Sequence, residues 1–321
     1  MAQGDAVRIL LAAPRGFCAG VERAIRAVED ALATFGAPVY VRHEIVHNAQ
    51  VVGALRAKGA VFVDHLSEAD PERPVVFSAH GVPKAVPRSA DARGFTYIDA
   101  TCPLVSKVHA EAKRFHARGL AVALVGHAGH PEVIGTLGQL PEGAATLIET
   151  EEDARRFQPA DPDKIAYVTQ TTLSVDDTAS ILAVLRERFP ALVGPAKGDI
   201  CYATSNRQDA VKAIAGEADV MLIVGDPASS NSNRLVETAR AAGCPKAVLV
   251  DEPAAPPTEF IAGARTIGVS SGASTPETSI EALLAALRTH CGDVVVEERR
   301  QTEETVAFRP PAVVTPRALA G

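Results

Sequence analysis

Short apolar runs rich in β-branched residues alternate with stretches of helical period along almost the whole chain. Such alternation is typical of βαβ units, in which strands lie parallel in a sheet and the intervening helices cover its faces. The sequence therefore predicts an α/β protein with parallel sheets. The expected strands are Val7–Ala13, Val39–Val41, Val61–Val63, Val75–Ser78, Thr96–Ile98, Ala121–Val125, Ala145–Ile148, Ile165–Thr169, Val220–Val224, Ala247–Val250 and Thr266–Val269.

Three cysteines occupy one repeated setting within this alternation. Cys18, Cys102 and Cys201 each follow a short apolar run and open a stretch with helical period. We expect each thiol at a helix N-terminus, where N–H groups and the positive end of the helix dipole favour a thiolate. Three thiolates from distant parts of the chain indicate one shared soft metal centre. Three ligands rather than four indicate a centre with an open position.

The spacing of the cysteines also suggests how the chain is divided. A length of 321 residues suits two or three units. We expect three pseudo-equivalent α/β units, at residues 7–101, 102–197 and 198–296, with one of these cysteines in each. Residues 297–321 turn charged and then proline-rich, so we expect a tail without a core of its own.

Composition argues against several classes of protein. A net charge of −7 and an aromatic content of 4%, with no Trp, argue against a nucleic-acid binder. No run approaches the roughly 18 apolar residues of a membrane span, and the start has no signal-peptide pattern. Five cysteines at wide spacings argue against a secreted disulfide framework. We therefore expect a cytoplasmic protein that binds neither nucleic acid nor a membrane.

Six short apolar segments, five of them expected strands, are followed by reactive or hydrogen-bonding side chains. Ligands of open parallel sheets bind beyond the carboxyl ends of the strands. Three of these ends carry histidine, which ordinary turns seldom do. The side chains in question are His47, Asn48, Ser78, His80, His127, His130, Glu132, Thr169, Thr171, Thr172, residues 229–233 and residues 270–274.

These groups are suited to bind a compact anion, and one of them is suited to act as an acid. The run Ser229–Asn233 precedes a helical stretch, and Ser274 begins a helix-start pattern with proline in the first turn. Hydroxyls, amides and helix N–H groups can hold a diphosphate without many basic residues. The sequence has neither a Walker A loop nor G-x-G-x-x-G. Glu132, in a Gly-rich loop after His130, is the candidate acid, provided that burial or a neighbouring charge raises its pKa.

Two other interpretations stay open. One is a zinc-dependent hydrolase, because His127, His130 and Glu132 have the spacing of zinc ligands, although loop histidines also bind anions. The other is a non-catalytic sensor or scaffold in which the three cysteines hold a metal cluster. We interpret the remaining cysteines as small core residues, the other histidines as surface residues and the basic run 107–118 as a solvated helix face. These residues are Cys244, Cys291, His43, His65, His109, His116 and His290.

The longest motifs resemble those of the LytB family, over about residues 8–296. They are Pro14–Gly20, Val46–Asn48, Ser78–Val82, Asp99–Val105, Gly126–Glu132, Thr169–Thr178, Asp199–Thr204 and Ser229–Arg234. The resemblance implies an iron–sulfur reductase of the non-mevalonate isoprenoid pathway. We expect it to remove the hydroxyl of (E)-4-hydroxy-3-methylbut-2-enyl diphosphate as water with two electrons and two protons, giving isopentenyl and dimethylallyl diphosphate.

The resemblance also implies a site. One 4Fe–4S cluster would lie at the centre of the three units, held by three thiolates, with the fourth iron open to the hydroxyl of the allylic diphosphate. Ferredoxin or flavodoxin would supply the electrons. Glu132 matches the proton donor, Thr171 the proton relay with Thr172 beside it, and His130 a histidine of the ligand pocket. The matched cluster ligands are Cys18, Cys102 and Cys201, and the matched diphosphate contacts are His47, His80, Ser229, Ser230, Asn231 and Ser274.

Overall fold

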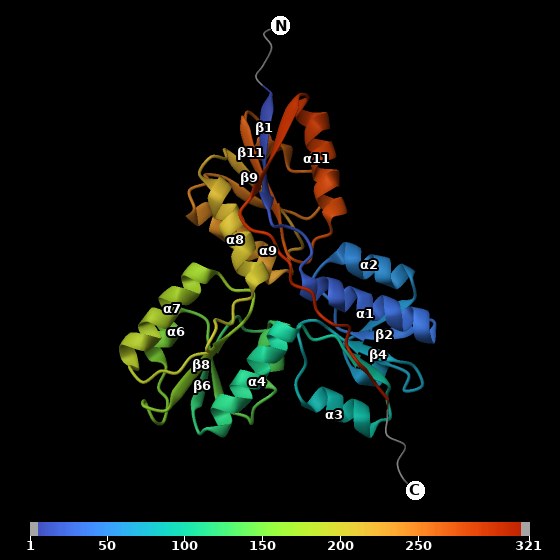
Figure 1. Ribbon diagram of the computed structural model, residues 1–321, viewed down its shortest axis with the longest axis vertical. Coiled ribbons are helices and arrows are strands. Elements are labelled where there is room, and N and C mark those ends of the chain that lie inside the picture. The colour runs from blue at the N-terminus through green and yellow to red at the C-terminus, as the bar shows by residue number, and fades with distance from the viewer. Residues whose placement is uncertain (1–5, 316–321) are drawn as a thin grey trace. The chain divides into compact units, whose positions relative to one another are not determined.

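The computed structural model describes residues 6–315 (Figure 1). The chain forms two compact units. The first contains the described residues up to Cys18, then His47–Ala49 and Tyr202–Val306. The second contains Ala19–Val46, Gln50–Cys201 and the described residues from Ala307 onward. None of the helices within residues 6–315 has the length and apolar character needed to cross a bilayer.

The first unit is built on a five-stranded, fully parallel sheet with the strand order β10-β9-β11-β1-β12. Its strands are β1 (Val7–Ala13), β9 (Val220–Val224), β10 (Ala247–Val250), β11 (Thr266–Ser271) and β12 (Val294–Arg300). Its helices are α8 (Tyr202–Ala215), α9 (Ser230–Ala241), the short α10 (Thr258–Ile261) and α11 (Glu277–Cys291).

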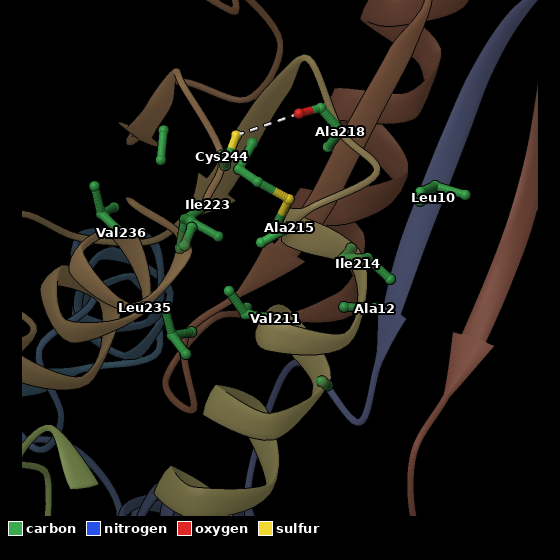
Figure 2. Packing of buried hydrophobic residues seen from close by; sticks show 14 residues of the cluster. Leu10, Ala12, Val211, Ile214, Ala215, Ala218, Ile223, Leu235, Val236 and Cys244 are labelled. Atoms are coloured by element: carbon green, nitrogen blue, oxygen red, sulfur yellow. Dashed lines mark hydrogen bonds between the residues drawn. The ribbon is translucent and has the colours of Figure 1, made fainter. Parts of the chain in front are cut away.

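The alternation of side chains along β1 explains how this sheet is covered on both faces. Leu10 and Ala12 pack into a cluster with residues of α8 and α9 (Figure 2). Ile9 and Leu11 pack into a second cluster with residues of α11. Successive strand residues point to opposite faces, so one apolar run supplies both cores. Cys244 lies in the first cluster, 3% exposed, which confirms that it is a core residue (Figure 2).

The second unit contains two sheets. One has the order β13-β5-β4-β2-β3 and is parallel except for the antiparallel pair of β13 with β5. The other is parallel with the order β7-β6-β8. The strands are β2 (Val39–Arg42), β3 (Ala60–Val63), β4 (Val75–Phe77), β5 (Tyr97–Asp99), β6 (Ala121–Val125), β7 (Ala145–Ile148), β8 (Ile165–Thr169) and β13 (Val313–Val314).

The helices of the second unit cover these sheets in the same way. On the three-stranded sheet, Val122 and Leu124 of β6 pack with α4 and α5, whereas Ala123 and Val125 pack with α6 and α7. The helices are α1 (Ala19–Phe35), α2 (Ala49–Ala57), α3 (Ala85–Ala92), α4 (Pro103–Ala117), α5 (Pro131–Leu137), α6 (Glu151–Arg156) and α7 (Val175–Arg188), and η1 (Leu66–Glu68) is a 3₁₀ turn.

The structure confirms the α/β class with parallel sheets and adds two strands that the sequence did not predict, β12 and β13. β1 pairs with β11 and β12 rather than with the strands of the expected segment 7–101. β12 runs across the start of the expected tail at residue 297, and β13 lies within that tail. Both strands pair with strands of the sheets. Residues 316–321 of that tail lie outside the described part. The division into three segments stays a prediction.

Candidate functional site

The three cysteines of the repeated setting share one local geometry. Each directly precedes a helix: α1 begins at Ala19, α4 at Pro103 and α8 at Tyr202. Each backbone N–H also donates to the carbonyl that lies two residues beyond the end of a strand. The pairs are Cys18 with Ala273 beyond β11 at 3.1 Å, Cys102 with Ala79 beyond β4 at 2.9 Å, and Cys201 with Thr171 beyond β8 at 3.0 Å.

This shared anchor confirms that the cysteines lie where strand ends and helix N-termini meet. In each case the cysteine and its anchor lie in the same unit. All three thiols are partly exposed, in contrast to the buried Cys244. Each cysteine therefore sits at the carboxyl end of a parallel sheet, which is where ligands of such sheets bind.

The first unit gathers most of the side chains expected to hold the anion. The segment His47–Ala49 belongs to this unit, and the Ser274 hydroxyl donates to the His47 carbonyl at 3.0 Å. Asp226 accepts from the Ala49 N–H at 3.0 Å and from the Ala228 N–H at 2.8 Å. Asp226 thus joins the loop of His47 to the loop before α9. The sequence interpretation missed Asp226, although this residue follows β9 after a single glycine, Gly225.

The N-terminus of α9 carries a buried asparagine, Asn231. Ser229 is the N-cap residue and accepts from the Ser232 N–H, and the Ser232 hydroxyl donates to Ser229 Oγ at 3.0 Å. Asn231 is 4% exposed, yet neither its Oδ1 nor its Nδ2 has a hydrogen-bond partner among the residues described. Buried amides are normally paired, so such an exception indicates a missing partner. Asn231 is therefore suited to bind a polar ligand.

Glu132, Thr171 and Cys201 are connected in the second unit. Glu132 lies in the first turn of α5 and is 2% exposed. The Thr171 N–H donates to Glu132 Oε1 at 2.7 Å, and the Thr171 hydroxyl donates to Oε2 at 2.9 Å. The Thr171 carbonyl accepts the N–H of Cys201. One residue therefore links the candidate acid to a candidate ligand.

The environment of Glu132 favours the neutral acid. Burial raises the pKa of Glu132 to about 7, the two hydrogen bonds from Thr171 oppose that rise, and the charge of Asp199 adds to it. A carboxyl with a pKa near the working pH can give up a proton and recover it. Burial thus meets the condition under which Glu132 is suited to act as an acid.

Two histidines lie close to Glu132. His130 is the N-cap residue of α5, and its Nδ1 accepts from the Glu132 N–H at 3.1 Å. The rings of His80 and His130 meet edge to face with centroids 5.8 Å apart. Thr172, in contrast, accepts from the Gln170 side chain at 2.9 Å, and Gln170 Oε1 accepts from the His127 N–H. The structure therefore brings His80, His130, Glu132 and Thr171 together, while Thr172 lies beside them.

A partly buried ion pair accompanies Cys201 and was missed by the sequence interpretation. Asp199 accepts from Lys107 Nζ at 2.9 Å and from the Thr169 N–H at 3.0 Å. Lys107 Nζ also donates to the carbonyls of Lys197 and Gly198. Lys107 therefore ties α4, which follows Cys102, to the turn before Cys201. Its position in a basic run concealed this role, since the run had been interpreted as a solvated face.

The surface assignment of His109 was wrong. The residue is 8% exposed, and burial together with the charge of Lys113 lowers its pKa to about 4. Its ring packs so close to Gly81 that a Cβ at Gly81 would collide with it. Gly81 also has φ +82, which L side chains rarely adopt. His109 thus shapes the loop that carries His80.

The zinc interpretation is not supported. Zinc ligands lie within about 2.0–2.3 Å of one ion, so they must converge closely. Within residues 6–315 no three His, Cys, Asp or Glu side chains are grouped as ligands of a metal ion. Glu132 is instead occupied by Thr171.

The fold and the site define an α/β protein whose thiols, acid and anion-binding groups lie at the carboxyl ends of parallel strands. The chain belongs to the family described as LytB protein, whose model matches residues 9–288. It is 58% identical to the 4-hydroxy-3-methylbut-2-enyl diphosphate reductase of Cereibacter sphaeroides over 306 residues, covering 95% of this chain and 96% of that protein. It is 57% identical to the Phenylobacterium zucineum protein of the same name, covering 98% of each chain.

Two solved structures resemble the chain. The E-1-hydroxy-2-methyl-but-2-enyl-4-diphosphate reductase from Plasmodium falciparum aligns with a TM-score of 0.92 at 34% identity, covering 96% of each chain. A structure of (E)-4-hydroxy-3-methyl-but-2-enyl diphosphate reductase, the terminal enzyme of the non-mevalonate pathway, aligns with a TM-score of 0.62 at 32% identity. It covers 88% of this chain and 99% of that one.

Proposed function

We propose that the protein is the reductase that completes the non-mevalonate pathway. It takes (E)-4-hydroxy-3-methylbut-2-enyl diphosphate, two electrons and two protons. The allylic C–O bond breaks, the oxygen leaves as water, and the carbon skeleton becomes isopentenyl or dimethylallyl diphosphate. Membership of the LytB family and the names of its close relatives support this reaction.

Membership of the LytB family implies an iron–sulfur cluster. The donor set fits a 4Fe–4S cluster because Cys18, Cys102 and Cys201 are partly exposed thiols in matching positions. Each cysteine of a cluster binds a different iron, so the three thiolates need not surround one ion. When bound, such a cluster supplies electrons singly, and an iron without a protein ligand acts as a Lewis acid on the substrate hydroxyl.

The diphosphate is bound by hydroxyl, amide and imidazole groups. Asn231 carries most of this argument, because its buried amide has atoms without partners at the N-terminus of α9. The helix N-terminus adds N–H groups and a favourable dipole. Binding energy from this remote end orients the allylic alcohol at the reacting end. The proposed contacts are His47, His80, His130, Thr172, Ser229, Ser230, Asn231 and Ser274.

Glu132 and Thr171 supply protons. At neutral pH the Glu132 carboxyl holds its proton in a substantial fraction of molecules, because burial raises its pKa to about 7. The Thr171 hydroxyl, 2.9 Å from Oε2, can exchange a proton with that carboxyl and pass one to the leaving oxygen. The family implies an electron donor, and we propose ferredoxin or flavodoxin. We place the reaction in the cytoplasm, where thiols stay reduced.

One observation carries the proposal most directly: Thr171 contacts both Glu132 and Cys201, so the proposed proton donor and a proposed cluster ligand share one anchor. The test is anaerobic purification of the full chain, followed by iron and sulfide analysis and by spectra before and after substrate is added. We expect iron and acid-labile sulfide together, and a spectrum that changes with substrate. Zinc without sulfide, or no spectral response, would overturn the proposal.

A further inference from the structure

We infer that Arg207 and Glu304 form a positioning pair that fixes the loop carrying Cys18, residues 14–18. The segment beyond β12 would then be part of the reductase site rather than a dispensable tail. This inference rests on the proposed role of Cys18 as a cluster ligand. It concerns contacts that lie entirely within the first unit.

The guanidinium of Arg207 holds the carbonyls of the Cys18 loop. Arg207 lies on α8 and is 0% exposed. Its Nε and Nη2 donate to the Gly16 carbonyl at 3.2 and 2.8 Å, and Nη2 also reaches the Phe17 carbonyl at 3.4 Å. Its Nη1 donates to the Ala203 carbonyl at 2.8 Å, within its own helix. The fork geometry of Arg is needed to reach these acceptors together.

The N–H groups of the same loop are held from another element. The Gly16 N–H donates to Ser271 Oγ at 2.9 Å, and the Cys18 N–H donates to the Ala273 carbonyl at 3.1 Å. Residues 271 and 273 come from the end of β11, whereas Arg207 comes from α8. The loop backbone is therefore fastened through its donors on one element and its acceptors on another, which leaves Cys18 little freedom.

Glu304 is the counter-ion that makes the buried Arg207 tolerable. Its Oε1 and Oε2 accept from Arg207 Nη1 at 2.9 Å and Nη2 at 3.3 Å, and Oε1 also accepts from Asn206 at 3.1 Å. A buried charge is stable only when it is paired, and removing one partner leaves the other uncompensated. Glu304 reaches this position because β12 pairs with β1 and leads the chain past the Cys18 loop.

A second ion pair connects the same loop and the same C-terminal part of the chain. Arg15 lies in the Cys18 loop and pairs with Glu298 of β12 at 3.0 Å and with Glu277 of α11 at 2.6 Å. Glu298 and Glu277 are exposed, so these contacts contribute less than the buried pair. They show that the loop has more than one attachment to the chain beyond α11. The buried Arg207–Glu304 pair is the attachment that holds the carbonyls of the loop in place.

The test compares Glu304→Gln with Glu303→Gln in the full chain, purified anaerobically. Glu303 is the exposed neighbour of Glu304 and serves as the matched control. Iron per chain is measured, and hydrogen exchange is followed in the peptide containing residues 14–18 and in α7. In Glu304→Gln we expect loop exchange to rise on the order of tenfold, with α7 unchanged and iron clearly reduced. Glu304→Asp, which keeps the charge, should recover part of both.

Wild-type iron and wild-type loop exchange in Glu304→Gln would overturn the inference. Equal acceleration in the loop and in α7 would also overturn it, because that result means a general loss of stability rather than positioning. Wild-type protein without iron would refute the proposed function instead. The exchange comparison would then still decide whether Glu304 holds the loop.

Discussion

Thr171 donates to both carboxyl oxygens of Glu132, from its backbone N–H to Oε1 and from its hydroxyl to Oε2. The carboxyl is buried, and burial raises its pKa to about 7. A neutral carboxyl can donate where a carboxylate can only accept. The contact with the hydroxyl is therefore able to carry a proton in either direction, and the backbone contact keeps the acid in one orientation.

Glu132→Gln should abolish proton delivery while keeping the shape of the side chain. A positioned acid contributes about 10²–10⁴-fold to rate, so we expect turnover to fall by roughly that factor. Iron content should stay at the wild-type level because Glu132 is not a proposed ligand. Steady-state turnover with a chemical reductant and iron analysis of the same sample measure both. Near-normal turnover would remove Glu132 from the mechanism.

The pH dependence of turnover should report the same carboxyl. The protonated form is the donor, and with a pKa of about 7 it is lost as the pH rises through that value. Wild-type turnover should therefore decline above about pH 7. Glu132→Gln should show no decline assigned to this group. A wild-type profile that stays level up to pH 8.5 contradicts a donor with this pKa.

Stability should respond to Glu132 in a defined direction. Below pH 4.5 the carboxyl is neutral in the folded and the unfolded chain. Between pH 4.5 and about 7 this carboxyl ionises only in the unfolded chain. The free energy of unfolding therefore falls as the pH rises through this range. The loss approaches roughly 3 kcal/mol above pH 7, at 1.36 kcal/mol for each pKa unit. Thermal unfolding should show Glu132→Gln more stable than wild type at pH 8 and closely similar at pH 4.5; the same difference at both pH values would contradict this.

Two asparagines of α9 should separate binding from stability. Asn231→Ala removes a buried amide that has no partner among the described residues, so stability should change by less than about 1 kcal/mol. Its KM for the diphosphate should rise at least roughly tenfold, because a ligand contact is lost. Asn233 is the contrast: its amide donates to the Pro227 and Ser229 carbonyls. Asn233→Ala should lower the Tm, and an unchanged KM in Asn231→Ala would refute the binding role.

Replacement of single cysteines should divide them into two groups. Cys18→Ser, Cys102→Ser and Cys201→Ser should each lose most of the bound iron, because a thiolate ligand is removed. Cys244→Ser should keep its iron, since Cys244 lies in the core and its thiol donates to the Ala218 carbonyl. Equal loss of iron from Cys244→Ser would contradict the assignment of ligands.

The sequence predicted the strand-to-helix settings because both depend on local patterns. Cys102 shows this well: a short strand precedes it, and proline at the first helical position follows it. The class of fold and most strand positions follow from the same alternation of apolar runs. These features need no knowledge of distant contacts.

Features that depend on distant contacts were not predictable in this way. β1 was expected to pair with strands that follow it closely in the sequence. It pairs instead with β11 and β12, whose residues lie more than 250 positions further along the chain. Lys107 reads as a surface lysine until its contact with the buried Asp199 is known. Glu304 looks like one more charged tail residue, and only its contact with Arg207 distinguishes it from Glu303.

The central claim is that this chain removes the hydroxyl of the allylic diphosphate through a cysteine-held cluster and the acid Glu132. The most direct measurement incubates the anaerobically purified chain with (E)-4-hydroxy-3-methylbut-2-enyl diphosphate and a chemical reductant, and identifies the products. We predict that isopentenyl and dimethylallyl diphosphate form together, and that Cys18→Ser and Glu132→Gln form far less of either. Recovery of unchanged substrate from iron- and sulfide-replete wild-type protein would contradict the claim.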